Sequence, residues 1–328
     1  METLRLGGDD GPRVTRLGLG MAALGRPAYI DVGHAQDFPD GRSPEAMERH
    51  AHAVLDAAYA AGIRYVDCAR SYGRAEVFVR AWLDARGPAP GEVVVGSKWG
   101  YRYVGGWRVD AKVHEVKDHS AGALAEQLAA SREALGPHLA LYQIHSATPE
   151  SGVLDDAAVL DALAALRDGG VRVGVTVSGL AQADTVRRAL GIQRGGAPLF
   201  SAVQATWNVL ERACEGALAE AHAAGRTVMV KEALANGRLG PRGAEGRAGP
   251  LAELARARGA SPDAVALAAV LAQPWADLVL LGAATVAQLE SNVTATGLAL
   301  SAAELAGLDT LRSDSAAYWS ERAALRWT

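Results

Sequence analysis

Apolar and polar positions alternate on two length scales along the chain. Short apolar runs typical of buried strands are separated by Ala- and Leu-rich stretches whose apolar residues recur with helical spacing, as in Ala46–Ala61 and Asp155–Arg167. Strands that alternate with helices indicate βα units and a parallel sheet. We therefore predict an α/β fold in which eight units close a (β/α)8 TIM barrel. The predicted strands are Leu17–Met21, Arg64–Asp67, Val93–Lys98, Leu139–His145, Val171–Val177, Ala202–Trp207, Thr227–Lys231 and Leu278–Leu281.

A few stretches depart from this repeating unit. The Gly-rich start predicts a short N-terminal hairpin over Gly7–Gly11. Long loops are predicted after the first, third and seventh strands, at Arg26–Ser43, Trp99–His119 and Ala235–Gly249. Each follows the C-terminal end of a strand, where a barrel builds its active-site rim. No linker divides the chain, so we predict one catalytic domain over residues 1–328.

Composition and charge narrow the functional classes. Hydrophobic residues make up 49% of the chain and charged residues 21%, which is typical of a globular protein. The formal net charge of −4 predicts no attraction to nucleic acid or to an anionic membrane. The two cysteines, Cys68 and Cys214, lie far apart in a chain without a secretory signal, so neither a disulfide framework nor a zinc site is indicated. We predict a cytoplasmic protein and leave its oligomeric state open.

Four polar residues stand at or just after the ends of predicted strands. Asp67 ends the second strand and Tyr72 follows it, while Lys98 and His145 end the third and fourth. We expect the four to meet, because successive strands deliver their C-terminal ends to one mouth of the barrel. A phenol alone is a poor proton donor or acceptor at neutral pH. We expect Lys98 to lower the pKa of Tyr72, Asp67 to hold the lysine charged, and His145 to donate a hydrogen bond to a substrate oxygen.

Each of these residues also has a structural interpretation. A strand-end aspartate often caps the next helix, a tyrosine beside glycine is often simply packed, and a strand-end histidine is often a satisfied core residue. Lys98 is harder to explain in this way, because it ends an apolar strand where a lysine needs a partner. A barrel lyase or isomerase that uses Lys98 as a Schiff-base amine is a further alternative.

Over essentially its whole length the chain resembles the aldo-keto reductases. The family's D-x4-Y-G-x-x-E segment is matched by Asp67, Tyr72, Gly73 and Glu76. Its strand-ending lysine is matched by Lys98, and its L-Y-Q-x-H segment by Leu141, Tyr142, Gln143 and His145. The resemblance implies an NAD(P)-dependent oxidoreductase that transfers hydride between nicotinamide and the carbonyl or hydroxyl of an aldehyde, ketone or sugar-like molecule. Tyr72 would be its general acid/base, and no metal is required. Two alternatives stay open: NAD-dependent oxidation of a sugar, as in aldose 1-dehydrogenases, and a non-catalytic nicotinamide-binding barrel that senses redox state.

The resemblance also implies where NADP or NAD binds. The matching positions are Gly20, Met21, Thr176, Gln204, Trp207, Lys231, Glu232, Ala233, Leu234, Asn236, Gly237, Leu239, Gly282, Ala284, Thr285, Gln288 and Asn292. Trp207 falls where the family commonly has a tyrosine and can stack on nicotinamide. Lys231 and Glu232 replace the start of the family's Y-S-P-L segment, and Val177 replaces an asparagine.

The turn after the last strand bears on the choice of cofactor. NADP-preferring members usually place a basic side chain there, whereas this chain has Gly282, Ala284 and Gln288 at the candidate positions. A 2′-phosphate without a cation loses charge-assisted hydrogen bonds, so we predict dual or NAD-leaning cofactor use. Arginines within Arg238–Arg247 are an alternative source of charge if that loop folds over the phosphate.

Aromatic residues of the predicted rim are candidates for the substrate pocket. They are Tyr29, Trp99, Tyr101, Trp107 and Trp319. Such residues either line a binding pocket or simply cover the barrel mouth. Together with the polar residues nearby they suit a sugar-like or other small carbonyl substrate.

Overall fold

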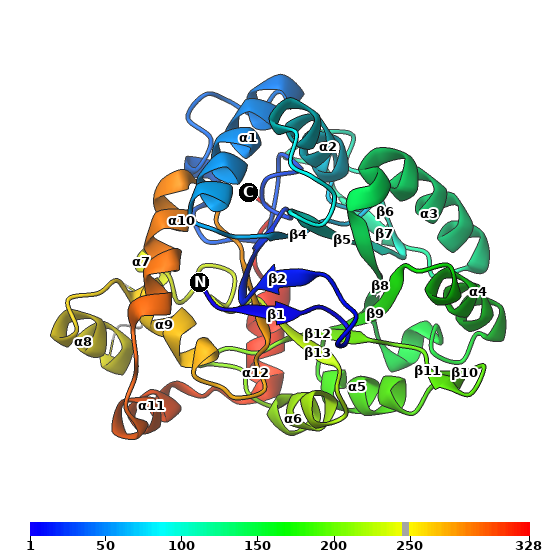
Figure 1. The fold of residues 1–328 in the computed structure, drawn as a ribbon. Helices are drawn as coiled ribbons and strands as arrows, with labels where there is room; N and C mark the ends of the chain where they lie inside the picture. The colour runs from blue at the N-terminus through cyan, green and yellow to red at the C-terminus, as the bar shows by residue number, and fades with distance from the viewer. Residues whose placement is uncertain (245–248) are drawn as a thin grey trace.

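Eight parallel strands close into a barrel in the computed structural model, which describes residues 1–244 and 249–328 (Figure 1). Each strand pairs with the next barrel strand along the chain, and the last pairs with the first. The strands are β3 (Leu17–Gly20), β4 (Tyr65–Asp67), β5 (Val94–Trp99), β8 (Leu139–Ala147), β9 (Arg172–Val177), β12 (Ala202–Thr206), β13 (Thr227–Lys231) and β14 (Leu278–Leu281). All eight correspond to predicted strands, so the (β/α)8 barrel is confirmed.

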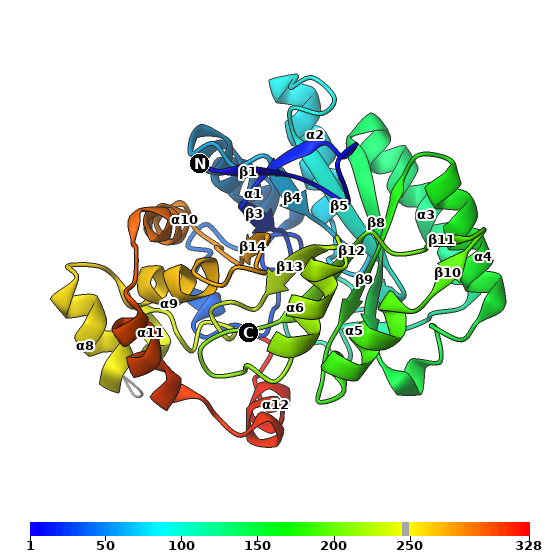
Figure 2. The ribbon, with the colours of Figure 1, turned by 60° about the horizontal axis from the view of Figure 1, so that its bottom comes forward.

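Helices between the strands cover the outside of the barrel (Figure 2). They are α1 (Pro44–Ala60), α2 (Ala75–Arg86), α3 (Ala121–Leu135), α4 (Ala157–Asp168), α5 (Gln182–Leu190), α6 (Glu215–Ala223), α9 (Pro262–Leu271) and α10 (Val286–Val293). Side-chain caps mark the starts of five of these helices: α1, α3, α4, α9 and α10. The Ser43 side chain accepts a hydrogen bond from the Ala46 amide, so α1 begins two residues before the predicted helix. The Asp156 side chain accepts from the Val159 amide, so α4 begins two residues after it.

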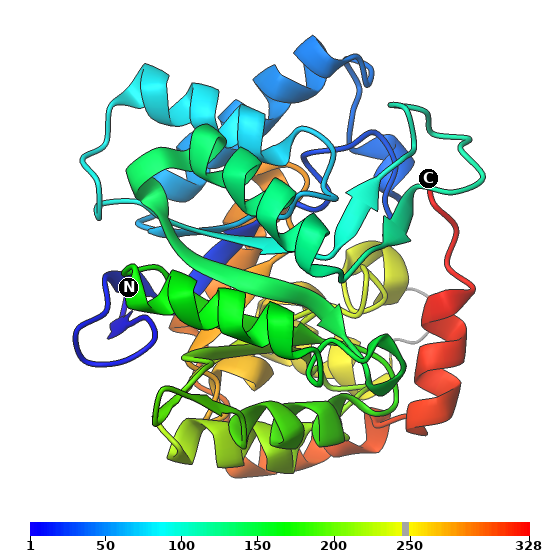
Figure 3. The ribbon, with the colours of Figure 1, turned by 90° about the vertical axis from the view of Figure 1, so that its right-hand side faces the viewer.

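The N-terminal hairpin plugs one end of the barrel. Strands β1 (Thr3–Arg5) and β2 (Arg13–Thr15) pair in antiparallel fashion around the predicted Gly-rich turn. Leu6 and Val14 are fully buried and pack with interior residues such as Leu141 and Met229. This hairpin and the C-terminus lie on opposite sides of the molecule (Figure 3). The C-terminal ends of the strands are therefore left for the site.

The three predicted loops carry short elements of their own. Trp99–His119 contains an antiparallel ribbon of β6 (Tyr101–Tyr103) and β7 (Glu115–Lys117), which the sequence did not predict within this loop. Strands of three residues are too short to show a period in the sequence. Arg26–Ser43 contains the 3-10 helix η1 (His34–Gln36), and Ala235–Gly249 contains α7 (Pro241–Ala244). Residues 245–248 of the last loop, which include Arg247, lie outside the described residues.

The remaining elements complete the outer layer. They are η2 (Gly136–His138), η3 (Pro149–Ser151), β10 (Gln193–Arg194), β11 (Ala197–Pro198), α8 (Gly249–Ala257), η4 (Thr294–Gly297), α11 (Ala302–Leu308), η5 (Asp309–Leu311) and α12 (Ser315–Ala323). In the described ranges 1–244 and 249–328, no helix combines the length and apolarity needed to cross a membrane.

Candidate active site

The four predicted catalytic residues come together at the C-terminal end of the barrel. The Lys98 ammonium donates hydrogen bonds to the Asp67 carboxylate, to the Cys68 carbonyl oxygen at 2.9 Å and to the Tyr72 hydroxyl oxygen at 3.3 Å. The Tyr72 and His145 rings meet edge to face with centroids 5.5 Å apart. A carboxylate, an ammonium, a phenol and an imidazole therefore form one connected group.

Strand alternation explains why these side chains meet. Val94 and Leu141 belong to the apolar cluster inside the barrel. Lys98 lies four residues beyond Val94 and His145 four beyond Leu141, so both point to the same interior side at the open end. Lys98 is 1% exposed and Asp67 2%, so the pair is enclosed by the barrel.

Asp67 is held by more than the lysine. Gln204 donates a hydrogen bond to its carboxylate at 3.2 Å, and Gln143 and the Tyr65 hydroxyl lie at 3.4 Å from the same oxygen. Gln204 was predicted to contact the cofactor, and it faces Asp67 in this structure. Gln143 and Tyr65 were not predicted, although both lie at inward-facing strand positions and could have been found by counting residues from Lys98 and Asp67.

Burial and neighbouring charges determine the protonation states of Tyr72 and His145. Burial, and next the Asp67 carboxylate, raise the pKa of Tyr72 well above its usual value. In the state described, burial therefore outweighs the lowering of this pKa that we predicted from Lys98. Burial, and next Lys98 and Lys231, lower the pKa of His145 well below its usual value. At neutral pH the phenol is protonated and the imidazole is uncharged.

A cavity of about 630 Å³ extends from these residues to the start of α10. Its size falls within the ordinary range for ligand sites. Asp67, Tyr72 and His145 line it, whereas Lys98 lies behind them. Twelve of the predicted cofactor residues line it as well: Gly20, Gln204, Lys231, Glu232, Ala233, Leu234, Asn236, Gly237, Gly282, Thr285, Gln288 and Asn292.

Comparison with known proteins identifies the family. The family model of the Aldo/keto reductase family matches residues 16–313, which is nearly the whole chain. The chain belongs to the aldo/keto reductase family. It is accordingly an oxidoreductase, and the family generally uses NAD(P)H.

Solved structures of aldo-keto reductases share the fold. The holo form of an aldo-keto reductase from Bacillus halodurans matches with a TM-score of 0.71 at 21% identity, covering 96% of this chain and 97% of that one. A putative aldo-keto reductase from Pseudomonas aeruginosa matches with a TM-score of 0.63 at 24% identity, covering 93% and 94%. No curated protein matches the chain.

Some predicted cofactor residues of this aldo/keto reductase lie outside the cavity wall. Trp207 is fully buried and meets Trp275 edge to face at 5.4 Å, so its predicted stacking on nicotinamide is not supported. The reason is strand alternation: Val203, Ala205 and Trp207 face the outer core, whereas Gln204 faces inward. The others outside the wall are Met21, Thr176, Leu239 and Ala284.

Some of the aromatic residues predicted to line the substrate pocket also lie outside the cavity wall. Tyr29 and Tyr101 line the cavity. Trp99 is fully buried, Trp107 donates a hydrogen bond to the Arg42 carbonyl oxygen at 2.7 Å, and Trp319 packs against Tyr318, so these three do not line it. They support the loops that surround the mouth, as the alternative interpretation expected.

Two residues that the sequence did not single out take part in the wall. Trp327 lines the cavity and stacks on His114 at 4.3 Å, because the C-terminal residues pair with the first loop through Tyr29 and Thr328. The Arg26 guanidinium lies 5.2 Å from the centroid of the Tyr72 ring. Nothing in the sequence indicates that the C-terminal residues return to this first loop.

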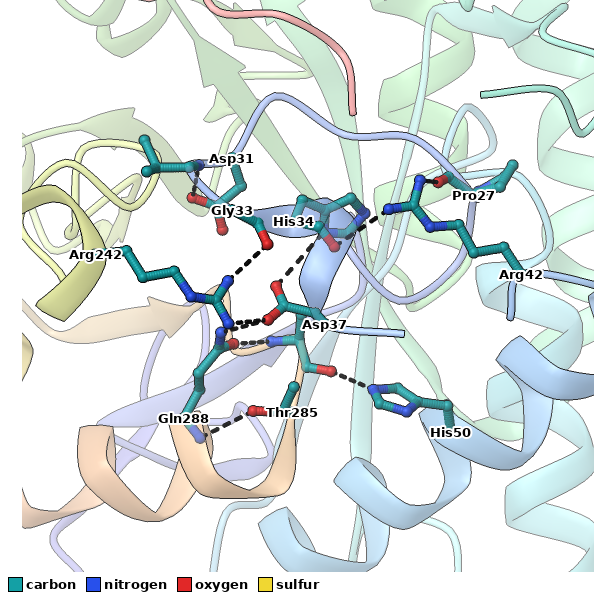
Figure 4. Close-up of polar contacts among 12 residues, drawn as sticks. Pro27, Asp31, Gly33, His34, Asp37, Arg42, His50, Arg242, Thr285 and Gln288 are labelled. Carbon is teal, nitrogen blue, oxygen red and sulfur yellow. Dashed lines mark hydrogen bonds and ion pairs between the residues drawn. The ribbon is translucent and has the colours of Figure 1, made fainter. Parts of the chain in front are cut away.

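A polar network joins three loops at the far end of the cavity (Figure 4). Arg242 donates hydrogen bonds to the Asp37 carboxylate and to the Gly33 carbonyl oxygen, both at 2.7 Å. Gln288 donates to the same Asp37 oxygen at 3.0 Å and accepts from the Ala284 amide at 2.7 Å. A guanidinium therefore reaches the turn that has no basic residue of its own, and Asp37 offsets its charge.

The wall suits a nicotinamide dinucleotide. The Asn236, Asp263 and Asn292 side chains line the cavity, and each has a buried oxygen that finds no hydrogen-bond partner in the part of the chain that the structure describes. Buried acceptors need donors, and ribose hydroxyls, the adenine amine and a carboxamide supply them. The backbone also bends sharply where the seventh loop crosses the cavity, with positive φ at Glu232, Ala235 and Asn236.

Proposed function

We propose that this chain is an NAD(P)-dependent oxidoreductase whose general acid/base is Tyr72, acting on the carbonyl or hydroxyl of a small molecule. The observation that carries the proposal is the contact of one buried lysine, Lys98, with both Asp67 and Tyr72 beside a cavity. We further propose that residues 1–328 form one catalytic domain and that it acts in the cytoplasm, where two buried free cysteines, Cys68 and Cys214, stay reduced.

The geometry supports a distinct role for each of these side chains in carbonyl reduction. A bound nicotinamide supplies the hydride. Lys98 donates to the phenol oxygen, so the Tyr72 proton is left to point at a substrate oxygen in the cavity. His145 Nδ1 lies 3.4 Å from Ser71 Oγ, which leaves Nε2 to orient that oxygen. As Tyr72 gives up its proton, Lys98 stabilises the phenolate. Oxidation of an alcohol follows the same path in reverse.

Charge at the far end of the cavity favours NAD over NADP. The Arg242 guanidinium shares an Asp37 oxygen with Gln288 of α10, and its charge is already paired with Asp37. Asp31 adds a carboxyl group to the wall, and among residues 1–244 and 249–328 its side chain accepts a hydrogen bond from the Val32 amide alone. As far as residues 1–244 and 249–328 show, a 2′-phosphate would meet the Asp37 carboxylate there without a free cation. We therefore propose NAD-leaning use, which also favours the alternative of sugar oxidation by an aldose 1-dehydrogenase-like reaction.

Two other interpretations are less consistent with the site. A Schiff base on Lys98 requires a free amine that reaches the cavity, whereas this ammonium makes three hydrogen bonds and lies behind the wall. A sensor without catalysis has no need of a proton donor held by a lysine.

Replacement of Tyr72 by phenylalanine tests the proposed function. We expect Tyr72→Phe to abolish oxidation or reduction of NAD(P)(H) against a panel of aldehydes, ketones and aldoses. Quenching of tryptophan fluorescence by the cofactor should be retained, because the ring stays in place. Unchanged turnover in the variant would refute the role of Tyr72, and no turnover of any substrate by the native protein would refute the function.

A further inference from the structure

Lys231 adds a second lysine to the open end of the barrel. It ends β13, two residues beyond Met229, which belongs to the interior apolar cluster. Alternation therefore directs its side chain inward, to the side from which Lys98 and Gln204 also project. Unlike Lys98, it lines the cavity. An ammonium thus stands beside the four catalytic residues.

This ammonium differs from the other cations of the wall. Across residues 1–244 and 249–328, no hydrogen bond or ion pair engages the Lys231 side chain. A buried or half-buried lysine normally has a partner. The three arginines of the wall each have a carboxylate: Arg26 pairs with Glu115, Arg242 with Asp37 and Arg322 with Glu232.

Among the described residues, the acidic neighbours of Lys231 are both engaged by other cations. Glu232 is the adjacent residue, but its carboxylate accepts hydrogen bonds from Arg322 at 2.5, 2.9 and 3.0 Å. Asp67 is engaged by Lys98. Both lysines act on His145, whose pKa is lowered by burial first and by these positive charges next. The catalytic end of the cavity is consequently electropositive.

We propose that Lys231 is a specificity-determining residue that binds an oxyanion carried by the carbonyl substrate. The preferred substrate class is then an aldehyde or ketone that bears a carboxylate or a phosphate ester. This inference rests on the proposed oxidoreductase function and adds to it the charge of the substrate. An oxyanion gives the ammonium the charge-assisted hydrogen bonds that the protein does not provide. In an enclosed cavity such a contact is screened less by water than at the surface.

Matched substrate pairs test the proposal in the complete protein with cofactor. The first pair is 4-oxobutanoate against butanal, which isolates a carboxylate, and the second is glyceraldehyde 3-phosphate against glyceraldehyde, which isolates a phosphate. We expect the native protein to favour the charged member of at least one pair. Lys231→Met should lower kcat/KM for that member about ten- to a hundred-fold more than it lowers kcat/KM for the neutral member. Lys231→Arg should retain part of the preference, because it keeps the charge.

The control is Lys112→Met, which removes an exposed lysine between β6 and β7 and should leave both members unchanged. Thermal melts establish that each variant is folded. Binding supplies a second readout: succinate should quench the fluorescence of enzyme-bound NADH in the native protein and less so in Lys231→Met.

The outcomes separate this inference from the proposed function. Turnover of the neutral aldehydes without a preference for charged ones, or a preference that survives Lys231→Met, would overturn the inference and leave the function standing. An equal loss of kcat/KM for both members of a pair would indicate that Lys231 contacts the cofactor, and it would overturn the inference as well. A borohydride-trapped adduct on Lys231 would show an amine that reacts with the carbonyl, which also contradicts the proposed role. Absence of turnover with every carbonyl would refute the function itself.

Discussion

Lys98 donates a hydrogen bond to the hydroxyl oxygen of Tyr72 at 3.3 Å from a position 1% exposed to solvent. The same ammonium contacts Asp67, so one lysine links the buried carboxylate to the proton donor. The link has two consequences. It fixes the direction of the phenol proton, and it makes the stability of the site depend on the charge of Lys98.

Replacement of Lys98 by methionine should separate these consequences. Lys98→Met leaves the Asp67 carboxylate buried without its cation, and breaking such a pair costs about 3–5 kcal/mol of stability. Loss of the charge beside the phenolate should lower kcat about 10²- to 10³-fold. The double variant Lys98→Met/Asp67→Asn should recover much of the free energy of unfolding, measured in urea, without recovering kcat. If the double variant recovered kcat to the same extent as the free energy of unfolding, the result would contradict the electrostatic role of Lys98.

Asp37 should control the choice of cofactor. Asp37→Asn frees the Arg242 guanidinium beside the α10 turn, so we expect the ratio of kcat/KM for NADP(H) to that for NAD(H) to rise about tenfold, the worth of one charge-assisted hydrogen bond. Asp40→Asn, an exposed residue of the same loop, is the matched control. An unchanged ratio in Asp37→Asn would show that Arg242 does not reach the 2′-phosphate.

The barrel could be predicted from sequence because its signals are local. Each strand is an apolar run, and Asp67, Lys98 and His145 mark strand ends. Trp207 shows the limit of reasoning by position in a family motif, because counting residues from Gln204 places it on the opposite side of β12. The side of a strand to which a residue points follows from its spacing along the sequence, so the sequence alone places Trp207 away from the cavity.

Other parts of the site depend on contacts between distant segments. Arg242 meets Asp37 across more than two hundred residues, and Trp327 reaches the mouth only because the C-terminus returns to Tyr29. Neither contact leaves a periodic pattern, since each comes from loops whose course is set by packing. The charge balance at the α10 turn could therefore not be predicted from the sequence.

Asp31 should make stability depend on pH. Burial, and next Asp37, raise its pKa from 3.8 to about 7. The folded protein therefore holds a proton that the unfolded chain has already lost, so stability falls as pH rises from about 4 to about 7. The Tm of Asp31→Asn relative to the native protein should increase over this interval and level off above it. A constant difference in Tm would mean that Asp31 ionises normally, and Asp40→Asn again supplies the control.

Lys231 should make substrate choice depend on pH. Burial lowers its pKa from 10.5 to about 8, and Arg322 and Lys98 act in the same direction, against the opposing effect of Glu232 and Asp67. Its charge is therefore present below about pH 8 and lost above it. The quantity to measure is the ratio of kcat/KM for 4-oxobutanoate to that for butanal, because titration of the catalytic residues affects both and cancels.

We expect this ratio to be highest below pH 8 and to decline with a midpoint near the pKa of Lys231 in the free enzyme. The reason is that the pH dependence of kcat/KM follows the ionisation of groups in the free enzyme. The same ratio of kcat values should decline at higher pH, because a bound oxyanion stabilises the ammonium. In Lys231→Met both ratios should be independent of pH. A decline that persists in this variant would assign the titration to another group and would remove the charge of Lys231 as its cause.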